Sequence, residues 1–98
     1  MIQDAASEPF VLTVVDVFDL TGRGTVVVGP IESGVMKTGD PVNVRRNREI
    51  VATAIARVEL INSRQADPRS IALLFQDLDG LRPESGDQIE GIAPTARL

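Results

Sequence analysis

In the first half of the chain, glycine-containing segments separate apolar runs, and this spacing limits the folds that the chain can adopt. In residues 16–44, DVFDLTGRGTVVVGPIESGVMKTGDPVNV, three apolar runs are separated by the segments TGRG and ESGVMKTGD. Such glycines serve either a phosphate cradle of backbone N–H groups or tight turns between strands. A phosphate cradle leads into a helix, but the run TVVV after Gly24 is typical of a strand. The Walker sequence is also absent, so the spacing predicts turns.

Short apolar runs separated by turn residues continue along the rest of the chain. We expect strands over 10–18, 25–31, 41–44, 50–61, 71–75 and 88–92. The alanine-rich range 50–61 could form a helix, but its alternating pattern favours a strand, and it has neither a good N-cap nor a glycine stop. Many short strands in 98 residues predict an all-β fold, either a small antiparallel barrel or a sandwich.

Several residue types with strong chemical roles are missing. The chain has no His, Cys, Trp or Tyr, and its aromatic residues are Phe10, Phe18 and Phe75. The usual general base, the thiol nucleophile, the preferred zinc ligands and most base-stacking platforms are therefore absent. We expect a protein that is not an enzyme and that binds no metal or cofactor. The acidic residues Asp77, Asp79, Glu84 and Asp87 lack the EF-hand spacing, so we expect them to shape turns.

The ends of the chain and its charge bear on location. The N-terminus MIQDAASEPF resembles no signal peptide, and no apolar run approaches the ~18 residues of a membrane span. With no cysteine to form disulfides, a cytoplasmic location is the simplest expectation. The net charge of −4 argues against broad nucleic-acid binding, although a small basic patch on an acidic body could still bind RNA.

Residues 9–44 resemble the second domain of elongation factor Tu and related translational GTPases, through Asp-Val-Phe, Gly-Arg-Gly-Thr-Val and Gly-x-x-Lys-x-Gly-Asp in order. VEL (58–60), IALLFQDL (71–78) and SGDQI (85–89) stand where that family places corresponding strands and its closing turn. The resemblance implies a closed six-stranded antiparallel β-barrel of the translation-factor domain 2 type.

On this resemblance, residues 9–94 form a stand-alone barrel, with 1–8 as a loose N-terminal arm and 95–98 as a C-terminal tail. The family keeps its GTPase chemistry in a preceding domain with a phosphate loop, which these residues do not contain. Its barrel contacts the 3′ end of tRNA, the small ribosomal subunit or neighbouring domains. The resemblance therefore implies a non-catalytic binding module.

Glu59 matches a family glutamate that lies at the terminal adenosine of tRNA. Asn62 and Ser70 stand where the family has an arginine and an asparagine, and the loop 61–70 is a few residues shorter. These changes argue against aminoacyl-tRNA binding. Glu59 could equally be a solvated or ion-paired residue of a strand.

Arginines supply the other candidates for RNA binding. Arg45, Arg46 and Arg48 form a basic cluster in RRNRE, which is expected to be a polar hairpin tip. They could contact RNA phosphates, or they could keep a sheet edge soluble. Arg23, in the TGRG turn, could contact an RNA phosphate or a neighbouring carboxylate.

The first two expected strands are apolar at both odd and even positions. In FVLTVVDVF, the apolar residues include Val15 and Val17 at odd positions and Leu12 and Val14 at even positions, which point to opposite faces of a strand. A barrel strand with a solvated outer face should alternate instead. We therefore expect a second copy or a protein partner to cover an apolar outer face, or else scattered surface valines of no consequence.

Overall fold

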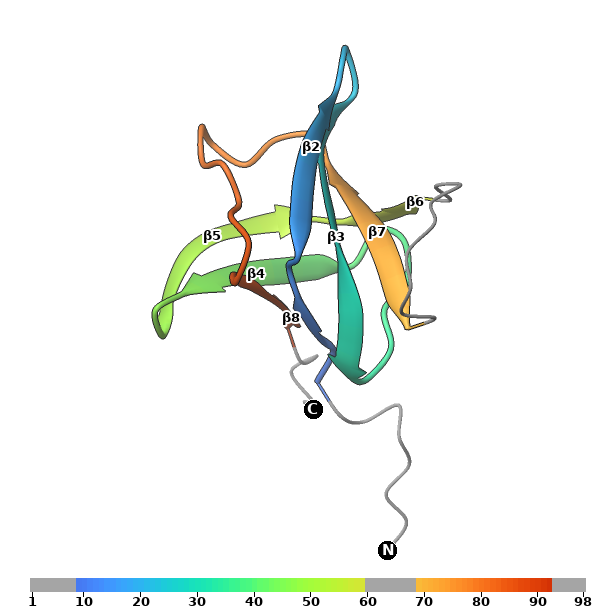
Figure 1. Ribbon diagram of the computed structural model, residues 1–98, viewed down its shortest axis with the longest axis vertical. Helices are drawn as coiled ribbons and strands as arrows, with labels where there is room; N and C mark the ends of the chain where they lie inside the picture. The colour runs from blue at the N-terminus through green and yellow to red at the C-terminus, as the bar shows by residue number, and fades with distance from the viewer. Residues whose placement is uncertain (1–8, 60–68, 93–98) are drawn as a thin grey trace, which may run out of the picture.

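The computed structural model describes residues 9–59 and 69–92, and within these ranges the chain forms strands and no helix (Figure 1). Eight short strands make an antiparallel sheet that curls into a half-barrel. The strands are β1 (Val11–Thr13), β2 (Asp16–Leu20), β3 (Gly24–Ser33), β4 (Pro41–Arg46), β5 (Glu49–Ile55), β6 (Arg57–Glu59), β7 (Ser70–Phe75) and β8 (Gln88–Gly91). The expected all-β class is confirmed.

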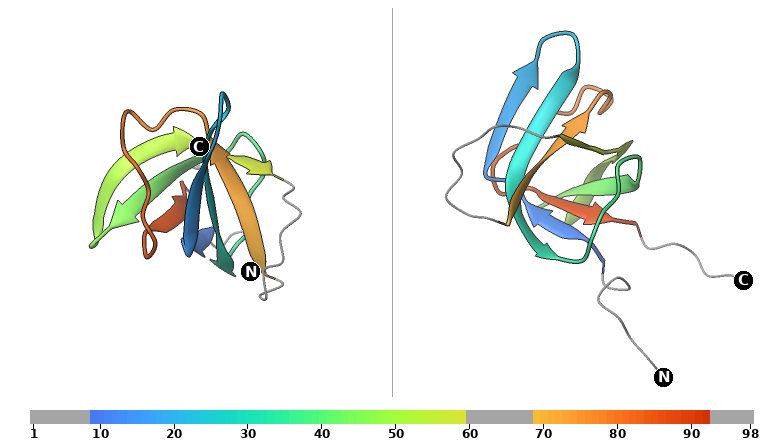
Figure 2. Two further views of the ribbon diagram at one scale, coloured as in Figure 1. Left: turned by 45° about the horizontal axis from the view of Figure 1, so that its top comes forward. Right: turned by 90° about the vertical axis from the view of Figure 1, so that its right-hand side faces the viewer.

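The sheet runs in the order β5-β4-β8-β1-β3-β7-β6, with β2 beside β3. Strand β3 is central to the sheet, because its first half pairs with both β2 and β7 and its second half pairs with β1. The β2–β3 hairpin projects from one end of the molecule (Figures 1 and 2). Residues 25–31 lie within β3, so the prediction that TGRG is a turn between strands, and not a phosphate cradle, is confirmed.

Two of the expected strands are each divided in the structure. The range 10–18 becomes β1 and β2, because the chain changes partners at Val14 and Val15. The Val14 N–H donates to the Asp87 carbonyl at 2.8 Å, and the Val15 N–H donates to the Val28 carbonyl at 2.8 Å. Residues 50–55 and 57–59 are extended as predicted, but Ala56 separates β5 from β6, and residues 60 and 61 of the expected strand lie outside the described residues.

Strand β3 passes very close to the end of β1. A Cβ atom at Gly29 would collide with the carbonyl group of Thr13. Only glycine fits this position, since any other side chain would require one of the two strands to move. The Gly29 position therefore allows β3 to pair first with β2 and then with β1.

Apolar side chains fill two clusters on opposite faces of the sheet. The larger cluster occupies the concave interior and includes Leu12, Val27 and Phe75, all at most 1% exposed. The smaller cluster contains Val26, Val28, Ala72 and Leu74, against which Phe18 and Leu20 pack. The outward-facing Val26 and Val28 are therefore buried within this chain, whereas Val15 is 48% exposed, and the coverage of an apolar outer face by a partner stays a prediction.

Candidate nucleic-acid interface

The β4–β5 hairpin carries three of the arginines that the sequence singles out for RNA binding. Its tip consists of Asn47 and Arg48, whose φ angles are 52° and 71°. Two successive positive φ values are typical of a type I′ turn, whose twist matches that of the flanking strands. Arg45 and Arg46 precede this turn and belong to β4, so the polar tip is shorter than RRNRE suggests.

Arg45 forms an ion pair with the neighbouring strand β8. Its Nε donates to Glu90 Oε2 at 2.9 Å, and its Nη1 donates to the Arg48 carbonyl at 3.0 Å. The two charged side chains are 32% and 24% exposed, respectively. The charge of Arg45 is therefore largely balanced within the chain.

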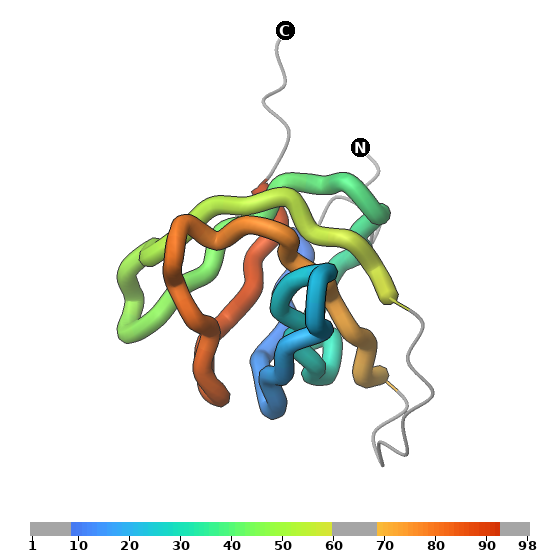
Figure 3. The backbone as a smooth tube through the Cα atoms, turned by 90° about the horizontal axis from the view of Figure 1, so that it is seen from above, coloured from blue at the N-terminus to red at the C-terminus, as the bar shows by residue number. Residues whose placement is uncertain are grey.

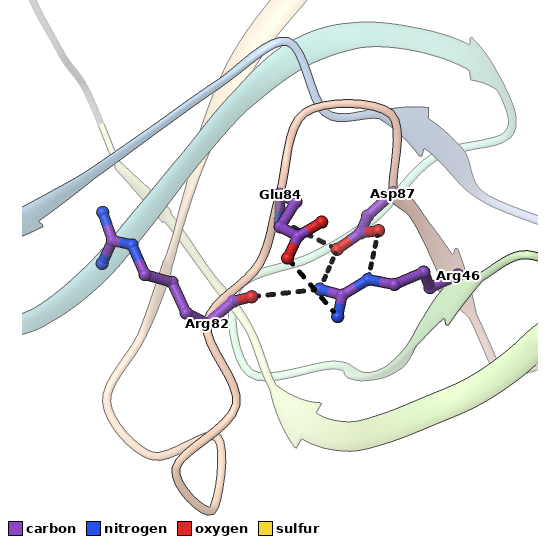
Figure 4. A network of polar contacts seen from close by, with 4 residues as sticks. All are labelled: Arg46, Arg82, Glu84 and Asp87. Carbon is purple, nitrogen blue, oxygen red and sulfur yellow. Dashed lines mark hydrogen bonds and ion pairs between the residues drawn. The ribbon is translucent and has the colours of Figure 1, made fainter.

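The Arg46 side chain connects β4 to the turn before β8 through hydrogen bonds and ion pairs (Figure 4). Its Nε donates to Asp87 Oδ1 at 2.9 Å and its Nη2 to Asp87 Oδ2 at 2.8 Å, the bidentate geometry that suits a guanidinium and a carboxylate. Nη2 also donates to the Arg82 carbonyl at 3.0 Å, and Nη1 lies 3.8 Å from the Glu84 carboxylate. Arg46 thus joins three points of the loop between β7 and β8.

Asp87 is the buried member of this network, with its side chain 3% exposed. Burial raises the pKa of the Asp87 carboxyl, but the hydrogen bonds from Arg46 and from the Glu84 N–H, at 2.9 Å, outweigh burial and hold it below its usual range. The same hydrogen bonds to Asp87 raise the pKa of Arg46. Both groups therefore stay charged near neutral pH, which suits a structural clamp better than proton transfer.

Arg23 and Glu59, which are 36 positions apart, form a separate ion pair. Arg23 lies in the turn of the β2–β3 hairpin, and its Nη2 donates to Glu59 Oε2 of β6 at 3.0 Å. Of the two partners proposed for Arg23 from the sequence, the structure places the carboxylate beside it. The Arg23 side chain remains 54% exposed. The turn lines an open hollow of about 580 Å³ together with Gln76.

The five candidate residues fall at two separate places. Arg23 and Glu59 lie by the β2–β3 hairpin, whereas Arg45, Arg46 and Arg48 lie at the β4–β5 hairpin, which points in another direction (Figure 1). Among the described residues, the Arg48 guanidinium has no ion pair. An RNA-binding role for these residues stays a prediction.

Sequence reasoning assigned Glu84 and Asp87 to turns and missed their pairing with Arg46, and it did not single out Glu90 or the pair formed by Arg82 and Asp19. Arg82 Nη1 donates to both oxygens of Asp19, at 2.8 and 3.0 Å, across 63 positions of the chain. The Arg82 hydrogen bonds hold the pKa of Asp19 below its usual range. No local pattern marks such a pair, because its members meet only when the loop before β8 folds beside β2.

The acidic residues near the end of β7 behave as turn formers. Asp77 Oδ1 accepts a hydrogen bond from the Asp79 N–H at 2.9 Å, and Asp79 itself has a φ of 55°. No group of three or more acidic side chains in the described ranges is arranged to hold a metal ion.

A scan against models of known protein families found none that matches this chain. Within residues 9–59 and 69–92, no helix has the length and apolar character needed to cross a membrane.

Proposed function

We propose that this chain is a non-catalytic binding module with the closed six-stranded barrel of the second domain of elongation factor Tu, and that it binds protein. The motifs of residues 9–44 and the half-barrel of antiparallel strands support this fold. Strands β5 and β6 stand at opposite ends of the strand order, yet Ala56 alone separates them in the chain. If 49–59 is counted as one bent strand and β1 and β2 as another, six strands follow one another around a ring.

A single observation carries the preference for protein over RNA: most of the candidate cations are already paired within the chain. Phosphate binding depends on cations that can neutralise the nucleic-acid backbone. Arg23, Arg45 and Arg46 each contact a carboxylate at 2.8–3.0 Å. By contrast, large apolar side chains such as Ile50 and Ile55 remain 51% and 55% exposed, which favours an apolar partner surface.

The carboxylates with shifted pKa values also support a role without catalysis. A general acid or base works best with a pKa near the operating pH. The pKa values of Asp19 and Asp87 are shifted the opposite way, further below neutrality, by their arginine partners. Together with the missing residue types, this leaves the chain with no evident group for acid–base or nucleophilic chemistry in the described residues.

RNA binding is the second candidate function, and it is favoured by the Arg48 and Arg23 guanidiniums. Arg48 lacks an ion pair in the described part of the chain, and Arg23 is half exposed. Filter binding of tRNA at about 50 and 200 mM salt separates the two functions, because phosphate contacts weaken steeply over this range.

We expect no saturable tRNA binding at either salt concentration. Saturable binding that weakens with salt, and that Arg23→Ala/Arg48→Ala abolishes, would overturn the protein-binding proposal in favour of RNA. Glu32→Gln provides a matched control, since Glu32 is exposed and removing its negative charge should not weaken a phosphate contact.

A further inference from the structure

The β4–β5 hairpin exposes a row of apolar side chains. Ile50, Val51 and Ile55 of β5 are 51%, 38% and 55% exposed, respectively. They are three of the six large hydrophobic residues exposed in the described ranges, and they lie together on one strand. In Figure 3 the tip of this hairpin lies at the left edge of the described backbone. We refer to these three residues as the β5 patch.

A β-bulge directs two members of the patch to the same face of the sheet. Val44 is buried in the concave core and pairs with Ala52. The next residue of β4, Arg45, pairs with Ile50, so Val51 is the extra residue of the bulge. Because Ala52 faces the core and Arg45 faces outward to bond Glu90, both Ile50 and Val51 point outward.

The third member of the patch lies on the same outer face. Ala54 and Ala56, on either side of Ile55, pack in the concave core, so Ile55 points away from it. The Arg57 side chain follows on this face, because Arg57 pairs with Leu74 of the outer apolar cluster. The β5 patch therefore runs along the outside of the hairpin, from its tip toward Arg57.

Positive charge borders the β5 patch at both ends. Arg48 lies in the turn before the patch and Arg57 lies after it, and neither has an ion pair in the described part of the chain. Glu49 pairs in register with Arg46 beyond the bulge, so it faces the opposite side of the hairpin. Two other carboxylates of the outer face are already paired with arginines: Glu59 and Glu90. On a chain of net charge −4, this face suits an acidic partner.

We propose that the β5 patch binds an amphipathic helix of a partner protein, with apolar side chains against the patch and acidic side chains at both ends. This inference rests on the proposed protein-binding function and names the kind of partner. A strand would pair with the edge of a sheet through its backbone, whereas a helix is the usual layer over the face of a sheet. The described ranges contain no helix that could provide this layer.

The length of the patch sets the length of the helix. Ile50 and Ile55 are five positions apart, which corresponds to about 16 Å along a strand. A helix covers this distance with about 11 residues, or three turns. Acidic residues just beyond these turns would then lie beside Arg48 and Arg57. Three side chains offer much less than the ~800 Å² that each partner buries in a stable interface, so we expect weak binding by an isolated helix.

Titration of the ¹⁵N-labelled full chain with synthetic peptides, followed by nuclear magnetic resonance, tests the proposal. The probe is a helical peptide of about 15 residues with leucine along one face, alanine elsewhere and glutamate at both ends. We expect saturable shifts of the β5 amide signals, with a Kd of about 0.1–1 mM. A second peptide with lysine in place of glutamate should bind about fivefold more weakly, because its charges repel Arg48 and Arg57.

Matched variants test the position of the site. Ile55→Thr removes apolar surface from the patch, and Val35→Thr removes it from a loop residue outside the patch that is 61% exposed. Both variants keep a β-branched side chain. We expect Ile55→Thr to weaken binding of the glutamate peptide about fivefold and Val35→Thr to leave it within about twofold. Arg48→Gly fits the φ of 71° at the turn and should weaken binding about threefold through the lost charge.

The absence of saturable shifts at millimolar peptide would overturn this inference, as would equal binding of the lysine peptide. Shifts of the β5 signals that grow with protein concentration alone would assign the patch to a second copy of the chain and would also overturn it. None of these results affects the broader proposal of protein binding. Salt-sensitive tRNA binding by the same preparation would instead overturn the proposed function itself.

Discussion

Replacing the buried carboxylate of Asp87 should weaken the fold more than any other single change of charge in the described residues. Asp87→Asn keeps the size and shape of the side chain but removes its charge. The native carboxylate accepts three hydrogen bonds, two from Arg46 and one from the Glu84 N–H. An asparagine can offer one acceptor oxygen, and its NH₂ group faces a donor.

The magnitude follows from the exposure of the two partners. Hydrogen bonds to a charged group contribute about 1.5–3 kcal/mol, and breaking a fully buried ion pair costs about 3–5 kcal/mol. The Asp87 side chain is 3% exposed, but the Arg46 side chain is 26% exposed and can reach water once its partner is gone. We therefore expect Asp87→Asn to lower the free energy of unfolding by about 2–3 kcal/mol.

The stability lost in Asp87→Asn should depend on pH only in acidic solution. Since the folded-state pKa of Asp87 lies below that of the unfolded chain, its ionised form stabilises the protein above the unfolded value of ~3.9. That stabilisation is lost as the pH falls through the folded-state pKa. The difference between the original protein and Asp87→Asn should therefore be constant above about pH 5 and should shrink in more acidic solution.

Urea unfolding followed by circular dichroism measures this difference, because the chain has no Trp or Tyr to report by fluorescence. Glu90→Gln is the matched control: it also removes one carboxylate from an arginine, but the Arg45–Glu90 pair is more exposed and should contribute below about 1 kcal/mol. Equal losses for Asp87→Asn and Glu90→Gln, or a difference that persists unchanged at acidic pH, would refute the reasoning.

Three further substitutions test the backbone and the second ion pair, each by the same urea unfolding. Arg48→Gly should raise stability by up to about 1 kcal/mol, because glycine adopts the φ of 71° without the strain of an L side chain; a loss would contradict the assigned turn. Gly29→Ala should lower stability by about 3 kcal/mol through its collision with Thr13, and a neutral effect would mean that the strands separate easily. Arg23→Ala should change stability by less than about 1 kcal/mol, since Arg23 is 54% exposed; a larger loss would show that its pair with Glu59 supports the fold.

The strands and turns could be predicted because their signals are local. Gly22 and Gly24 both have positive φ values around the β2–β3 turn, as expected where a chain reverses direction. The alternation of residues 50–55 likewise favoured a strand over a helix, and β5 confirms it. The divisions at Val15 and Ala56 escaped prediction, since each occurs where the strand exchanges one partner for another.

The surroundings of the arginines could not be read from their spacing. Arg45 and Arg46 are adjacent in RRNRE and suggest a single basic cluster, yet one contacts Glu90 and the other contacts Asp87. Their carboxylate partners lie 45 and 41 positions away and come within reach only when β8 pairs with β4. The sequence likewise suggested an apolar outer face on the first two expected strands, but it could not show that Phe18 and Leu20 pack against Val26 and Val28 of this face while Val15 remains 48% exposed.

The proposal that the charged side chains serve the fold and not RNA is tested most directly by nuclear magnetic resonance. Spectra of the arginine side-chain Nε–H groups should be recorded for the ¹⁵N-labelled protein at low salt while tRNA is added. We predict that the signals of Arg45 and Arg46, whose Nε atoms donate to Glu90 and Asp87, stay in place throughout the titration. Saturable shifts of these signals that disappear at higher salt would contradict it.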